Sequence, residues 1–220
     1  DFMEAIGPEA VAVLTANPQQ ARSNDTNFPY RPSSDILYLT GFREPEAVLV
    51  IAPGHEEGDF AMFVRPRDEE AELWEGGRAG TEGAIEEFGA DAAFGIDEID
   101  DKLPEFLADR QTLYYTLGRD PEFDDRVTGW LNSLRHRRNK PPAAPRALVD
   151  VRDPLHEMRL RKRPEEIELM RRANRITGQA HTLAMEHCQP GMREYELQAL
   201  IEYHFQRNGA EFPAYPSIVG

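Results

Sequence analysis

A proline-rich segment at residues 141–145 (Pro-Pro-Ala-Ala-Pro) constrains this chain more than any other feature. Proline fixes φ and lacks a backbone N–H, so the segment is expected to form a stiff, extended connector. Short apolar runs and helical patterns alternate before it. After one further short apolar run at residues 147–149, the pattern is helical almost throughout. We therefore expect two parts that fold differently, residues 1–152 and residues 153–220.

Four short apolar runs in the first part predict buried strands. They are residues 11–14, 36–39, 47–51 and 60–64. The segment between the last two, Pro-Gly-His-Glu-Glu-Gly at residues 53–58, is rich in turn-forming residues and predicts a hairpin.

Apolar side chains three and four residues apart predict helices later in the first part. The predicted helices cover residues 81–88, 99–107 and 123–134, and a strand is predicted at residues 112–116. Thr81 is the expected N-cap of the first helix, and Gly89 lies just past its end. Strands followed by alternating helices and strands predict an α/β fold, with a mixed β-sheet flanked by helices.

The second part is predicted to hold two helices. One begins at Pro164 and extends to His187, and the other covers residues 197–205. Arg163 stands where a small polar residue would cap the first helix, and its side chain cannot accept hydrogen bonds from the helix N–H groups. The apolar residues 218–220 are expected to begin a strand.

Composition excludes several classes of function. A net charge of −15 argues against a nucleic-acid or anionic-membrane partner, and no apolar run is long enough to cross a bilayer. The basic run at residues 135–140 closes a predicted helix, where positive charge complements the helix dipole. Cys188, the single cysteine, fits a reducing compartment. No charged and apolar leader opens the chain, so we expect a cytoplasmic location.

The candidate metal-binding side chains do not follow a known ligand spacing. His181, Glu186, His187 and Cys188 match no zinc signature, so a structural or surface role is expected. His156 and Glu157 are adjacent in the chain. Adjacent residues on a helix point about 100° apart, so the pair would not share a face, which favours packing over acid/base chemistry.

Three groups of residues resemble the aminopeptidase P family, in the order that the family has them. Residues 22–25, 30–31, 34–42 and 44–47 resemble its N-terminal domain. Residues 156–160, Lys162 and residues 164–167 resemble the opening of its catalytic domain. Residues 209–210, 212–213 and 215–220 resemble the strand that leads to that domain's substrate loop. The resemblance implies a creatinase/aminopeptidase P type N-domain at 1–152, then the first helices of a truncated α+β pita-bread domain at 153–220.

The resemblance also implies a function. The family removes an N-terminal residue when proline is second, and its catalytic domain holds two divalent metal ions, often Mn²⁺. The metal ligands (two Asp, one His and two Glu) lie downstream of the segment matched by residues 215–220, so none is expected here. Without the ligands there is no metal-activated water, and the 220 residues alone are expected to be inert.

The resemblance assigns substrate contacts to Trp74, Asp25 and Tyr215. In this family the N-terminal domain can border the active site of a neighbouring subunit, which implies a homo-oligomer. Trp74 is expected beside glycines at a strand end, where loop-borne contacts are common. The alternatives are a partly buried packing tryptophan and a turn-capping aspartate at position 25.

Two other interpretations stay open. A prolidase or creatinase-like enzyme would share the two-domain plan. A non-catalytic oligomerisation or binding module would use the N-terminal domain without the chemistry.

Overall fold

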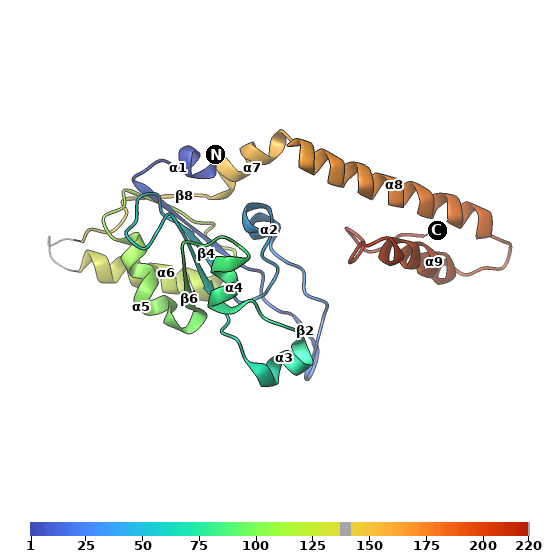
Figure 1. Cartoon of the computed structure of the whole chain (residues 1–220), viewed down its shortest axis with the longest axis horizontal. Coiled ribbons are helices and arrows are strands. Elements are labelled where there is room, and N and C mark those ends of the chain that lie inside the picture. Colours follow the sequence, from blue (N-terminus) through green and yellow to red (C-terminus); the bar gives the residue numbers. More distant parts are fainter. Residues whose placement is uncertain (137–141, 220) are drawn as a thin grey trace. The chain divides into compact units, whose positions relative to one another are not determined.

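The computed structural model describes residues 1–136 and 142–219 (Figure 1). It divides into two compact units, Asp1–Arg159 (unit 1) and Leu160–Gly220 (unit 2). In the predicted basic run, Arg135 is the last residue of helix α6 (Pro121–Arg135) and His136 follows it, whereas residues 137–140 lie outside the described residues.

Unit 1 contains a six-stranded sheet with the order β6-β5-β4-β1-β7-β8. Its strands are β1 (Ala10–Thr15), β4 (Val48–Ile51), β5 (Phe60–Val64), β6 (Ala92–Gly95), β7 (Thr112–Tyr114) and β8 (Ala147–Val149). Strand β4 pairs antiparallel with β1 and with β5, and the other three pairings are parallel. The sheet is therefore mixed, as predicted, and every strand except β4 runs in the same direction.

Both faces of the sheet are buried. Val11 and Val13 of β1 pack on the face covered by α5 (Ile99–Leu107) and α6. Ala12 and Leu14 point to the opposite face. That face is covered by α1 (Phe2–Ile6), α2 (Ser34–Thr40), α4 (Gly80–Glu86) and α7 (Arg152–Leu160). The three-layer arrangement confirms the prediction of a sheet flanked by helices.

The predicted strand at residues 36–39 is wrong, because these residues lie in helix α2. Ile36 is the one fully buried residue of α2, and Tyr38 and Leu39 pack partly buried against the same core. Gly41 (φ 78°) ends the helix in the left-handed conformation, and its N–H donates to the Leu37 carbonyl. An apolar run of four residues cannot be told from a short helical segment by periodicity alone.

Most other predicted elements of unit 1 are confirmed. They are the strands at residues 11–14, 47–51, 60–64 and 112–116 and the helices at residues 99–107 and 123–134. Helix α4 begins at Gly80, so Thr81 lies within it and is not its N-cap. Several elements of unit 1 were not predicted from the sequence. They include α1, α3 (Glu69–Glu75), the hairpin strands β2 (Ala21–Ser23) and β3 (Thr26–Asn27), β6, the 3₁₀ turn Ile96–Glu98, and α7.

Unit 2 consists of two helices that pack against each other, α8 (Pro164–His187) and α9 (Glu194–Arg207). At their N-termini, Glu166 and Glu196 accept hydrogen bonds from the backbone N–H of Arg163 and Arg193, at 2.9 and 2.7 Å. In each helix, a carboxylate three residues past the arginine thus accepts from the backbone N–H of that arginine, which is one half of a capping box.

Unit 2 buries very little apolar surface. Ala180 is the one buried residue of α8, and α9 has none. Ile218 and Val219 are not in a strand, and the last residue of the predicted strand lies outside the described residues. Across residues 1–136 and 142–219, no helix combines the length and the apolar character needed to span a membrane.

Candidate functional site

The predicted metal-ligand candidates do not converge. Within the described part of the chain, no group of three or more His, Cys, Asp or Glu side chains is placed to hold a metal ion. His181, Glu186 and His187 are exposed on α8, and Cys188 is exposed just beyond it. His156 and Glu157 are exposed on α7. These residues therefore do not fit a two-metal centre.

Trp74 lies on helix α3 with 87% of its surface exposed. The sequence-based expectation of a strand end is wrong, and so is the alternative of a partly buried packing residue. Asp68 caps the N-terminus of the helix, and its carboxylate accepts from the N–H groups of Glu70 and Ala71 at 3.1 and 3.0 Å. An aspartate followed by acidic residues is a helix-start signal that would have revealed α3 in the sequence.

Asp25 lies in the turn of the β2–β3 hairpin. Asn24 in the same turn has a positive φ of 42°, and both residues are exposed. The Asp25 carboxylate accepts from the Thr26 hydroxyl at 3.5 Å, which is a weak contact. The side chain is therefore free to meet an external partner, while Gln19 and Gln20 bond to Phe28 and fix the base of the hairpin.

Strand direction brings Trp74 and Asp25 to the same edge of the sheet. The β2–β3 hairpin follows the carboxyl end of β1, and α3 follows the carboxyl end of β5. Both strands pair antiparallel with β4, so they run in the same direction. The two predicted contact residues of unit 1 therefore extend from one edge, which we call the carboxyl edge.

Tyr215 belongs to unit 2, in the segment that follows α9, and is 71% exposed. The Ser217 hydroxyl donates to Glu202 of α9 at 2.7 Å and holds this segment against the helix. Tyr215 is thus accessible within its own unit.

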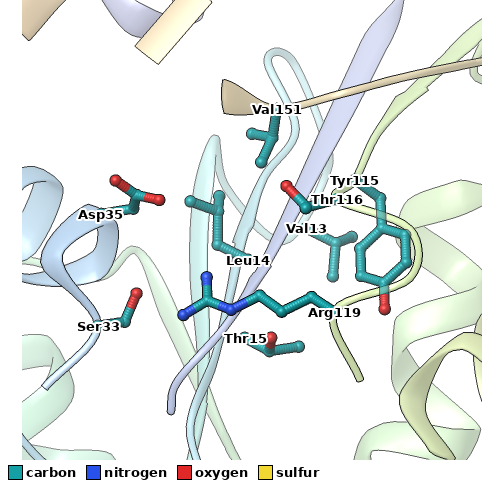
Figure 2. Close-up of a pocket in the computed structure, with 9 residues that line it drawn as sticks. All are labelled: Val13, Leu14, Thr15, Ser33, Asp35, Tyr115, Thr116, Arg119 and Val151. Carbon is teal, nitrogen blue, oxygen red and sulfur yellow. The ribbon is translucent and has the colours of Figure 1, made fainter. Parts of the chain in front are cut away.

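A small recess opens at the carboxyl edge between β1 and β7 (Figure 2). The chain leaves β1 toward α2 on one face of the sheet and leaves β7 toward α6 on the other. Such a switch point is where open α/β sheets commonly bind ligands. The cavity measures about 10 Å³, enough for one water-sized group. It is lined by Val13, Leu14, Thr15, Ser33, Asp35, Tyr115, Thr116, Arg119 and Val151.

The polar side chains of the recess differ in whether they have hydrogen-bond partners. Thr116 donates to Asp150 at 2.9 Å, and Asp35 accepts from Arg159 at 2.7 Å. Arg119 donates to the Asn17 side chain. The Ser33 hydroxyl is buried, and among the described residues it has no hydrogen-bond partner. No sequence pattern predicted this recess, because its residues come from four separate segments.

Asp150 sits beside the recess and links β8 to α7. Hydrogen bonds from Arg152 hold the pKa of the Asp150 carboxyl well below its usual range, and the Thr116 hydroxyl acts in the same direction. Arg152 donates to it from both the backbone N–H and the side-chain Nε, each at 3.0 Å. The charged carboxylate therefore fastens the start of α7 to the end of β7.

Two family models match this chain. The model described as aminopeptidase P, N-terminal domain, matches residues 1–114, and the model described as metallopeptidase family M24 matches residues 168–220. A curated Xaa-Pro aminopeptidase of Escherichia coli is 42% identical and covers 100% of this chain and 50% of the relative. Xaa-Pro aminopeptidase 3 of Homo sapiens is 31% identical, with 97% and 42% covered.

Solved structures give the same result. Aminopeptidase PepP of Pseudomonas aeruginosa superposes with a TM-score of 0.94 at 44% identity, over 99% of this chain and 49% of that one. Aminopeptidase P of E. coli gives a TM-score of 0.93 at 41% identity, over 99% and 50%. The chain spans about half the length of the curated relatives that it matches.

Removing the hydroxyl of Ser33 and removing that of Thr116 are predicted to have different effects on the free energy of unfolding. Ser33→Ala removes a buried group without a partner, so the free energy of unfolding should stay constant or rise by up to about 1 kcal/mol. Thr116→Val removes a hydrogen bond and should lower it by about 1 kcal/mol. Urea denaturation measures both values. A clear loss of stability in Ser33→Ala would show that the hydroxyl is satisfied by a bound molecule.

The Asp150 interactions predict an acid-sensitive contribution to stability. Because its folded-state pKa is lowered, the carboxylate stabilises the fold fully above about pH 4, the unfolded value, and this contribution is lost progressively as the pH falls from there toward the lowered folded-state pKa. Asp150→Asn should cost about 1 kcal/mol at pH 7 and flatten the dependence of the urea midpoint between pH 5 and pH 3. Asp153→Asn, in the first turn of α7, is the control. Parallel curves for Asp150→Asn and the parent protein would contradict the prediction.

Proposed function

This chain belongs to the aminopeptidase P family, and from that premise we propose that it is part of a metal-dependent Xaa-Pro aminopeptidase. The intact protein would release the N-terminal residue from peptides that have proline in second position. The observation that carries the proposal is the likeness to Xaa-Pro aminopeptidases over the whole length of this chain. Since the chain spans about half of those relatives, the activity is proposed for the intact protein.

Two divalent metal ions are proposed for the intact protein, with Mn²⁺ suited to carboxylate-rich ligands. When bound, such a pair activates a water molecule and polarises the carbonyl of the bond to be cut. The described residues of this chain do not supply a fitting donor set. We therefore place no catalytic residue here and propose that the 220 residues alone are inert.

The proposed contribution of this chain is substrate contact. An indole that is 87% exposed offers a broad apolar face on which a proline ring can pack. The exposed Asp25 carboxylate at the same edge offers a partner for the charged amino terminus of a peptide. Tyr215, exposed in unit 2, is proposed as a third contact.

We also propose a cytoplasmic homo-oligomer without nucleic-acid or membrane partners. Leu73 and Trp74 are 81% and 87% exposed on one short helix, and apolar groups of this size favour coverage by a protein surface. A neighbouring subunit that supplies its peptide site would provide this cover. The net charge of −15 supports the absence of an anionic partner.

The intact protein is predicted to cleave Ala-Pro-Ala and to release alanine. Activity should be lost in EDTA and restored by Mn²⁺, and Ala-Ala-Ala should be a poor substrate. The 220-residue chain should be inactive with or without Mn²⁺. Chromatography of the released amino acid measures each case. Cleavage restricted to the dipeptide Ala-Pro would indicate a prolidase, and an intact protein that cleaves none of these would favour the binding module.

Trp74→Ala in the intact protein is predicted to lower kcat/KM for Ala-Pro-Ala by about tenfold, because the lost contact is on the order of 1–2 kcal/mol. Trp74→Phe keeps an aromatic face and should retain more activity. Leu117→Ala removes another exposed apolar side chain, from the segment between β7 and α6, and is the control. Equal kcat/KM in Trp74→Ala and in the parent protein would contradict a contact between Trp74 and the substrate.

A further inference from the structure

We infer that Glu44, Arg65, Glu75 and Arg78 form a clamp that positions Trp74 at the carboxyl edge. The inference rests on the proposed function in one respect, the contact of Trp74 with substrate. The clamp itself follows from the contacts of α3 with the rest of unit 1.

Helix α3 is not held by apolar packing. It has no buried residue. A helix of seven residues is too short to be stable by itself in water. The helix is therefore positioned by polar contacts. The pair of Arg67 with Glu72 lies within residues 66–78, whereas the pair of Glu75 with Arg65 joins the helix to the rest of unit 1.

Glu75, the last residue of α3, is the first half of the clamp. Its Oε2 accepts from Arg78 Nη2 at 2.9 Å and from Arg65 Nη1 at 3.2 Å. Arg78 holds the pKa of Glu75 below its usual range, and Arg65 adds to the effect. Glu75 is adjacent to Trp74 in the chain, so these two ion pairs fix the backbone beside the indole.

Glu44 is the second half of the clamp and belongs to the segment before β4. Its Oε2 accepts from Arg65 Nη2 at 3.4 Å, and its Oε1 accepts from the Ala79 N–H at 2.7 Å. Arg65 thus joins Glu75 of α3 to Glu44, which in turn holds the residue before α4.

Arg78 also closes the loop that carries α3. Its Nη1 donates to the carbonyl of Pro66 at 3.3 Å, so the first and last residues of the loop 66–78 are bound to each other. Gly76 (φ 93°) lies between Glu75 and Arg78 in a conformation that favours glycine. Without the ion pairs of the clamp, the backbone at Gly76 could rotate and the loop 66–78 could change shape.

Three of the four clamp side chains are largely shielded from water. Arg65, Arg78 and Glu44 are 15%, 12% and 20% exposed, whereas Glu75, which pairs with both arginines, is 53% exposed. The Nε atoms of both arginines are buried and have no partner in the part of the chain that the structure describes. Ion pairs shielded from water are stronger than exposed ones, and breaking one leaves a desolvated charge. We therefore infer that the shielded charges of Arg65, Arg78 and Glu44 set the position of helix α3, which is otherwise exposed.

Glu75→Gln in the intact protein tests the clamp, because it keeps the side-chain shape and removes the charge that binds both arginines. Amide hydrogen exchange of residues 69–78 should accelerate by about tenfold. Glu70→Gln, with the same charge change in the exposed first turn of α3, is the matched control and should leave exchange within about twofold. Unchanged exchange in Glu75→Gln would overturn the clamp.

A double-mutant cycle connects the clamp to Trp74. Glu75→Gln should lower kcat/KM for Ala-Pro-Ala, and should have little further effect in a Trp74→Ala background. Faster exchange with unchanged kcat/KM in Glu75→Gln and in Trp74→Ala would leave the clamp standing and overturn the role of Trp74. Additive losses in the double variant would show that the clamp does not act through Trp74.

If Glu75→Gln lowers the thermal midpoint of the whole protein, Arg65→Lys is the second variant. Lysine keeps the positive charge but lacks the planar fork that bridges Glu44 and Glu75. Local exchange should accelerate at residues 69–78 while the core strands β1 and β4 stay protected. Loss of protection throughout unit 1 would assign Arg65 to stability and overturn positioning.

Discussion

Burial of the central strand β1 on both faces is the constraint on which unit 1 depends. Val11 and Val13 face one core, and Ala12 and Leu14 face the other. A strand without a solvent face needs helices above and below it, so the chain must cross the edge of the sheet repeatedly. The crossings leave polar loops at the carboxyl edge. The recess, the β2–β3 hairpin and α3 all lie in or beside the loops that make these crossings.

The carboxyl edge is held together by charge where apolar packing is absent. Asp150 fastens β7 to α7, Arg159 reaches Asp35 at the start of α2, and the clamp fastens α3. These contacts are directional, so they can hold the backbone of α3 in place without covering its side chains, which apolar packing cannot do. Trp74 can therefore remain 87% exposed and still have a defined place.

The sequence predicted the parts of unit 1 that are dictated by burial. The apolar run at residues 11–14 and the helical spacing from Ile99 to Leu107 reflect side chains that the core requires. The run at residues 36–39 was assigned wrongly, because α2 fully buries only Ile36 and an apolar run of four residues is too short to show a period. Helix α3 was missed because no buried side chain marks it. Glu44 and Arg65 are distant in sequence, and only the pairing of β4 with β5 brings their segments together.

The two units differ in what stabilises them, and this difference is relevant to the roles that they would have in the proposed enzyme. Unit 1 has two cores, one on each face of its sheet, whereas Ala180 is the one buried residue on the helices of unit 2. An amphipathic helix pair with so little buried surface gains stability by packing against further structure. Unit 1, in contrast, presents Trp74 and Asp25 from a scaffold stabilised by its own cores. A contact surface on such a scaffold keeps its geometry through the cores of unit 1, which suits the contribution to a neighbouring subunit's site that we propose.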